Sequence, residues 1–209
     1  MWARVVSFLF HPLLIPTYFF SFLSLTVPTA LAPVAPHVQS QVLGFVFLVT
    51  CVIPVLNLGM VRSLGGFRTF EMPTRKERMV PFVLISVIYV AVTFMFGAYG
   101  KMTLNDSFLK FIIVIDMLVV AATVATFFFK VSVHTLAVWG LVGILVPLNK
   151  ITEIESVFYG TVAVIALAGF IMSARLITGA HTSREVMWGA VMGLITGFGG
   201  MLILFRNLA

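Results

Sequence analysis

The sequence predicts an all-α, polytopic membrane bundle of six to seven transmembrane helices, and three observations support that fold class. Of the 209 residues, 61% are hydrophobic and only 10% are charged. The mean hydropathy is +1.14, well above that of ordinary soluble domains. Apolar runs also recur at about 20 residues, the length that crosses a bilayer core. We therefore expect one integral membrane domain over residues 1–209, with no separate soluble domain.

Seven apolar segments are each close to the length of a membrane span. The first two would form an N-terminal pair of spans within residues 6–61, and the others would lie in a core over about residues 62–205. In chain order the segments are 6–28, 41–61, 80–98, 108–129, 133–149, 157–174 and 186–205.

The first segment is the least regular, because His11, Pro12 and Pro16 interrupt it. An interfacial or re-entrant element tolerates such residues better than a straight span does. A cleaved signal peptide is the rival interpretation, since Arg4 precedes the apolar run and Ala30-x-Ala32 resembles a cleavage site. We expect the segment to be retained.

Charge and cysteine content limit the classes of partner. The formal net charge is +6, from 13 basic and 7 acidic residues. Such a balance suits anionic lipid headgroups, an anionic substrate or cytoplasmic loops equally well. The single Cys51 excludes an internal disulfide and a zinc-type cysteine cluster. No metal, cofactor or nucleic-acid partner is predicted, and the oligomeric state is left open.

Polar residues gather in three clusters: the connection 62–79, the short break "FFFKVSVHT" at 127–135, and "RLITGAHTSREV" at 175–186. Two apolar segments separate the first cluster from the second, and two more separate the second from the third. An even number of spans returns the chain to the same face of the membrane, so all three clusters should share one face. That face receives nine of the thirteen basic residues: Arg4, Arg62, Arg68, Arg75, Lys76, Arg78, Lys130, Arg175 and Arg184.

These residue types suit phosphoryl transfer. Arginine presents a planar fork of donors that matches phosphate oxygens. A histidine can attack phosphorus if a carboxylate holds its other ring nitrogen. His181 and Glu185 are four residues apart, so they meet within one turn if a helix begins near Thr182. His134 could then protonate the leaving group.

The two histidine clusters carry a family resemblance. Arg175-x5-His181-x3-Glu185 resembles the third signature of the type 2 phosphatidic acid phosphatase superfamily, S-R-x5-H-x3-D, and "VSVH" at 131–134 resembles its second signature, P-S-G-H. The resemblance implies a metal-independent membrane phosphatase with no cofactor. It implies His181 as nucleophile, Glu185 as its orienting carboxylate and His134 as acid and base, with Arg175 and Ser132 binding phosphate.

The chain departs from these signatures at several positions. Val131 and Val133 replace proline and glycine in the second signature, where Lys130 adds a charge, and Ala174 and Glu185 replace serine and aspartate in the third. In the first signature, K-x6-R-P, Arg68-x6-Arg75 keeps the spacing with Lys76 in place of proline, and Arg78 offers a competing alignment. The full set of expected phosphate ligands is Arg175, Arg75, Arg78, Ser132, Lys130, Arg68 and Lys76.

Two classes of function follow. The favoured class is a lipid phosphatase that cleaves a phosphomonoester or pyrophosphate, such as phosphatidic acid or undecaprenyl pyrophosphate, through a phosphohistidine; a lipid phosphotransferase of the same family is the close alternative. The rival class is a transporter or permease of a small anion, with Asp116 in "FIIVIDMLVV" as its intramembrane ionisable group. The resemblance implies a site that faces the periplasm or a lumen, so we expect a bacterial inner membrane protein with the site towards the periplasm, although basic loops alone predict the cytoplasm.

Two further patterns have structural interpretations. Gly189, Gly193 and Gly197 recur every four residues, which predicts close helix packing. His11 and Asn57 are expected to satisfy local backbone or interhelix partners rather than to form a site.

Overall fold

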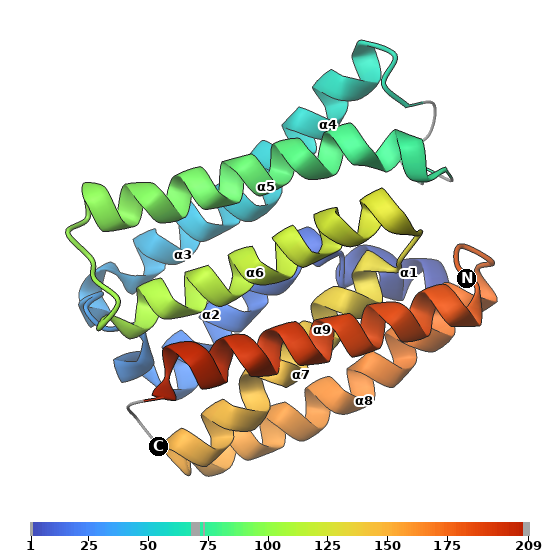
Figure 1. Ribbon diagram of the computed structural model, residues 1–209. Helices are drawn as coiled ribbons and strands as arrows, with labels where there is room; N and C mark the ends of the chain where they lie inside the picture. The colour runs from blue at the N-terminus through green and yellow to red at the C-terminus, as the bar shows by residue number, and fades with distance from the viewer. Residues whose placement is uncertain (1, 68–71, 73, 207–209) are drawn as a thin grey trace. The chain divides into compact units, whose positions relative to one another are not determined.

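The computed structural model describes residues 2–67, 72 and 74–206, and the chain in these ranges is helical (Figure 1). Three 3-10 turns, Pro12–Leu14, Pro28–Leu31 and Pro36–Val38, and one π-helical turn, Leu48–Val52, connect longer helices. The α-helices are α1 (Trp2–Leu9), α2 (Ile15–Thr26), α3 (Gln39–Phe47), α4 (Ile53–Ser63), α5 (Arg75–Ala98), α6 (Ser107–Phe128), α7 (Val133–Thr152), α8 (Glu155–Ile177) and α9 (Ser183–Leu204).

The predicted apolar segments are confirmed as helices. Seven helical stretches of the described chain are long and apolar enough to cross a membrane, which indicates an integral membrane protein. Their bounds are Trp2–Thr26, Pro36–Ser63, Arg75–Ala98, Ser107–Phe128, Val133–Thr152, Glu155–Ile177 and Ser183–Leu204. The first is broken where the sequence predicted an interruption: α1 ends at Leu9, and Pro12 opens a 3-10 turn before α2.

The chain divides into two compact units. Unit 1 combines Met1–Ile15 with Val131–Ala209, and unit 2 is Pro16–Lys130. The third cluster and residues 131–135 of the second, with Ser132 and His134, therefore fall in unit 1. Lys130 and the described part of the basic connection 62–79 fall in unit 2. The prediction that all three clusters share one membrane face stays a prediction.

In unit 1, α7 and α9 pack backbone against backbone through the glycine repeat. A Cβ atom at Gly193 would collide with the carbonyl oxygen of Leu136, and one at Gly189 would lie 2.6 Å from that of Ser132. Residue numbers rise together along the two helices, so α7 and α9 run parallel and begin at the same end. The predicted close packing is confirmed. The facing pairs are Gly189 with Ser132, Gly193 with Leu136, and Gly197 with Gly140.

Helix α8 completes unit 1 by packing against α7 and α1. Val138 of α7 and Ile171 of α8 are fully buried, and Val6 and Phe10 from the N-terminal segment pack against them. The N-terminal segment thus shares a hydrophobic core with helices more than a hundred residues further along the chain.

In unit 2, α5 packs against α6, and phenylalanine side chains of α6 pack against those of α2. The rings of Phe19 and Phe111 have centroids 5.3 Å apart, and those of Phe20 and Phe108 lie at 5.2 Å. All four side chains are almost completely buried. The first pair is T-shaped and the second is tilted, and both geometries are favourable inside a core.

Candidate functional site

The third cluster is shaped by the start of α9. Thr182 is the N-cap residue, and its hydroxyl accepts a hydrogen bond from the Glu185 backbone N–H at 3.3 Å. The Glu185 carboxylate accepts in return from the Thr182 backbone N–H at 3.4 Å, which completes a capping box. The helix begins at Ser183, which meets the condition for a contact between His181 and Glu185.

This helix start brings His181 and Glu185 together. His181 Nδ1 lies 2.7 Å from Glu185 Oε2, and the two side chains are 2% and 19% exposed. A carboxylate can only accept, so Nδ1 carries the proton. The lone pair of a neutral His181 imidazole is then on Nε2, the nitrogen that would attack phosphorus. Sequence spacing predicted this contact correctly.

The second cluster lies at the start of α7 and is bonded to the third. The Ser132 backbone N–H donates to the Glu185 carbonyl oxygen at 3.1 Å. The Ser132 hydroxyl is fully buried and accepts a hydrogen bond from the Thr135 hydroxyl at 2.9 Å. Ser132 thus has a structural role that the motif did not predict, and its main chain joins the two motifs directly.

His134 is held by the N-terminal segment. Its Nε2 lies 3.0 Å from the carbonyl oxygen of Ser7. The His11 ring stands edge-to-face against it, with centroids 5.3 Å apart and planes at 82°. Neither contact was predicted individually, but His11 was expected to satisfy local backbone or interhelix partners, and it contacts both the Leu13 N–H and the His134 ring. The one available signal was the His11-Pro12 break in an otherwise apolar run.

Arg175 lies in the last turn of α8 and is half-buried. Its charge is close enough to act electrostatically on the imidazoles of both His11 and His134, and His181 also acts on His134. Unit 1 therefore brings together His11, His134, Arg175, His181 and Glu185.

Two helix N-termini add to the positive character of this site. Since α7 and α9 run parallel and the hydrogen bond from Ser132 to Glu185 joins their first turns, both N-termini lie at one end of unit 1. Each N-terminus carries a partial positive charge, which favours an anion. The helix dipoles and the Arg175 charge thus both favour binding of an anion at this end of unit 1.

The predicted ligands of the basic connection have structural partners in unit 2. Arg75 Nη1 donates to the carbonyl oxygens of Phe127 and Phe128, at 3.0 and 2.9 Å, where α6 ends. Arg78 is buried, and its Nε donates to the carbonyl oxygen of Met72 at 2.8 Å. Basic side chains commonly satisfy the last carbonyls of a helix in this way.

Phosphate binding by Arg75 and Arg78 stays a prediction. Lys76 is exposed and Lys130 half-buried, both in unit 2, and binding by these two lysines is equally untested. Arg68 lies outside the described residues.

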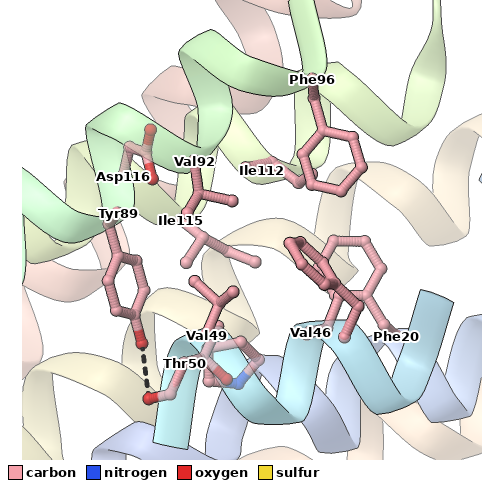
Figure 2. A pocket seen from close by; sticks show the side chains of 12 residues that line it. Phe20, Val46, Val49, Thr50, Tyr89, Val92, Phe96, Ile112, Ile115 and Asp116 are labelled. Carbon is pink, nitrogen blue, oxygen red and sulfur yellow. Dashed lines mark hydrogen bonds between the residues drawn. The ribbon is translucent and has the colours of Figure 1, made fainter. Parts of the chain in front are cut away.

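In unit 2, the polar residues Thr50, Tyr89 and Asp116 line a small cavity of about 30 Å³ (Figure 2). Tyr89 donates its hydroxyl to the Thr50 carbonyl oxygen at 3.0 Å. Pro54 lacks the N–H that would otherwise bond this carbonyl in an α-helix. Asp116 borders the cavity and is 8% exposed, and its buried Oδ1 has no hydrogen-bond partner among the described residues. Most of the lining is apolar, including Phe20, Val46, Val49, Phe96, Ile112 and Ile115.

Within the described ranges, no group of three or more His, Cys, Asp and Glu side chains is placed to hold a metal ion. No family model, curated protein or solved structure matches this chain. The resemblance to the type 2 phosphatidic acid phosphatase superfamily therefore depends on the motif residues alone.

Proposed function

We propose that the chain is an integral membrane lipid phosphatase resembling the type 2 phosphatidic acid phosphatases, acting through a phosphohistidine on His181. The observation that carries the proposal is the direct bond between the two motifs. Ser132 of the second motif donates to the Glu185 carbonyl, while the Glu185 carboxylate holds His181 Nδ1. Hydrogen bonds thus join the proposed nucleophile His181 to Glu185, and Glu185 to the second histidine motif.

In the first step, His181 Nε2 attacks phosphorus and the bond between phosphorus and the leaving oxygen breaks. Glu185 stabilises the positive charge that develops on the imidazole, because its carboxylate faces Nδ1–H at 2.7 Å. The bound anionic phosphate favours protonation of His134, which then gives its proton to the leaving oxygen. Arg175 and the N-termini of α7 and α9 stabilise the negative charge on the phosphoryl oxygens.

In the second step, water attacks the phosphohistidine and the P–N bond breaks. His134, now neutral, takes a proton from the attacking water. Phosphate leaves and His181 returns to its original state. If an alcohol reaches the site in place of water, the same sequence transfers the phosphoryl group to that alcohol, which would make the chain a phosphotransferase.

The proposed substrate is a lipid phosphomonoester or pyrophosphate. Seven helices that are long and apolar enough to cross a membrane support a substrate whose tail remains in the bilayer while its anionic head reaches the ends of α7 and α9. Phosphatidic acid and undecaprenyl pyrophosphate are both of this class. We propose that the site faces the periplasm of a bacterial inner membrane.

The test is phosphate release from a panel of lipid phosphates and pyrophosphates by the detergent-purified protein in excess EDTA. We expect His181→Ala to abolish release and His37→Ala, a matched histidine substitution in unit 2, to leave it unchanged. Release that persists in His181→Ala would overturn the nucleophile assignment. A folded wild-type chain that is inert on the whole panel would overturn the proposed activity.

Asp116 supports a second candidate function, proton-coupled transport. An ionised carboxylate is costly inside a membrane, so such groups are commonly protonated or bind a cation. The cavity beside Asp116 suits a proton or a water-sized cation better than an anion, which the carboxylate would repel. Proton uptake by proteoliposomes that Asp116→Asn abolishes and His181→Ala retains would favour transport over the phosphatase.

A further inference from the structure

The N-terminal segment, residues 2–14, contacts residues of the candidate site, although no sequence motif predicts this. The Ser7 carbonyl that meets His134 is 127 residues away in sequence. Helix α1 packs on α8, and the turn Pro12–Leu14 packs on α7. These contacts place the segment against the two helices that carry Arg175 and His134.

The Ser7 contact distinguishes the two nitrogens of His134. A carbonyl oxygen only accepts hydrogen bonds, so the nitrogen beside it must carry a proton. That nitrogen is Nε2 of His134, which lies 3.0 Å from the Ser7 carbonyl oxygen. In the neutral imidazole the lone pair is therefore on Nδ1.

His11 holds the same ring from another direction. Its own Nδ1 accepts the Leu13 backbone N–H at 3.4 Å, which caps the 3-10 turn and fixes the His11 side chain. The fixed ring then packs edge-to-face against His134, a geometry that aromatic rings prefer. One short segment thus restrains His134 both through a backbone hydrogen bond and through ring packing.

We infer that residues Ser7 and His11 are positioning elements of the site, which hold His134 so that it exchanges its catalytic proton through Nδ1. This inference rests on the proposed function. In the first step, protonated His134 gives the Nδ1 proton to the leaving oxygen and becomes neutral, keeping the Nε2 proton on Ser7. In the second step, Nδ1 takes a proton from water as the water oxygen bonds to phosphorus.

The four histidines of the chain make the assignment directly measurable. The full-length protein, labelled with ¹⁵N-histidine and solubilised in detergent, is observed by NMR at about pH 8, where an unperturbed imidazole is neutral. Single substitutions of His11, His37, His134 and His181 assign the signals. We expect His134 to carry its proton on Nε2 and His181 to carry its proton on Nδ1. A His134 proton on Nδ1, or an equal mixture of both forms, would overturn the inference.

Three substitutions then test the part played by His11. We expect His11→Ala to release His134 into a mixture of both forms and His11→Phe, which keeps a ring for edge-to-face packing, to preserve the single form. His37→Ala is the control and should leave the His134 signals in place. An unchanged His134 spectrum in His11→Ala would refute the positioning role, provided that its melting temperature matches the wild type.

Kinetics separate this inference from the proposed activity. On a substrate that the wild type hydrolyses, we expect His11→Ala to lower kcat about tenfold with KM unchanged, because a misplaced acid-base group affects the transition state. We expect His11→Phe to retain most of the wild-type kcat. If the protein shows the expected His134 spectrum but hydrolyses no substrate, the phosphatase proposal is wrong and the Nε2–H assignment is retained. If the protein is active but His134 carries its proton on Nδ1, the phosphatase proposal is retained and the positioning inference is wrong.

Discussion

The two regions that the sequence marked as phosphate-binding differ in what their polar side chains contact. In unit 1, the histidine motifs contact each other: His181 bonds to Glu185, whose carbonyl oxygen accepts the Ser132 N–H. In unit 2, the arginines of the basic connection contact main-chain carbonyls, and Arg75 binds the end of α6. Side chains that converge on one another support a reaction site, whereas an arginine bonded to a helix end already has a sufficient structural reason to be present.

The largest effect should come from Glu185→Gln, which tests whether the carboxylate in unit 1 does more than cap α9. A glutamine can still accept the Thr182 N–H, but it cannot stabilise a positively charged His181 and can reverse its tautomer. We expect phosphate release to fall by roughly 10²–10⁴-fold, measured as kcat, with little change in melting temperature.

Thr182→Ala is the matched control for Glu185→Gln, because it removes the cap and leaves the carboxylate. We expect a loss of about 1 kcal/mol in unfolding free energy and nearly normal kcat. If the two substitutions lower kcat equally, the role of Glu185 is capping alone.

The next effect compares arginines from the two regions. Arg175→Ala removes a charge near His134 and should lower kcat roughly 10²–10³-fold, as loss of a transition-state donor does. Arg75→Ala leaves the last carbonyls of α6 without their donor and should instead lower the unfolding free energy by about 1–3 kcal/mol with kcat retained. Thermal unfolding and phosphate release of both variants measure the contrast. A collapse of kcat in a stable Arg75→Ala protein would place Arg75 in the phosphate site.

The smallest effect concerns the packing that holds the motifs together. In Gly193→Ala the new methyl group meets the Leu136 carbonyl, so α7 and α9 must separate, at a cost of about 1–3 kcal/mol. Gly199→Ala on the same helix has open space around it and should be neutral or gain up to about 1 kcal/mol from helix propensity. Equal melting temperatures for the two variants would contradict the tight interface.

Much of this arrangement could be predicted because it depends on local spacing. Hydropathy over some 20 residues located the seven helices, and the four-residue interval between His181 and Glu185 predicted their contact. The glycine repeat predicted the close packing of α9 for the same reason, since every fourth residue lies on one helix face.

The remaining features depend on contacts with main-chain atoms, which leave no mark in the sequence. Any residue has a carbonyl oxygen, so nothing distinguishes Ser7 as the partner of His134. The carbonyls that bind Arg75 are equally indistinguishable in the sequence, so this contact could not be predicted, and phosphate binding by Arg75 stays a prediction. His11 was visible as an interruption, but its contact with His134 requires the tertiary fold.

The parallel pair of α7 and α9 has a mechanical consequence. Carbonyl oxygens at Ser132, Leu136 and Gly140 repeat every four residues, as do the glycines that face them. A slide of one repeat, about 6 Å along the axis, would again set a glycine opposite a carbonyl. Gly143 breaks this repeat, because a slide of four residues would bring Trp139 or Pro147 against the Leu194 carbonyl oxygen that Gly143 now faces. The Gly143 contact and the hydrogen bond from Ser132 to Glu185 therefore both favour the observed register. A slide that would leave the glycine repeat intact would thus still cost the Gly143 contact and the bond that joins the two motifs.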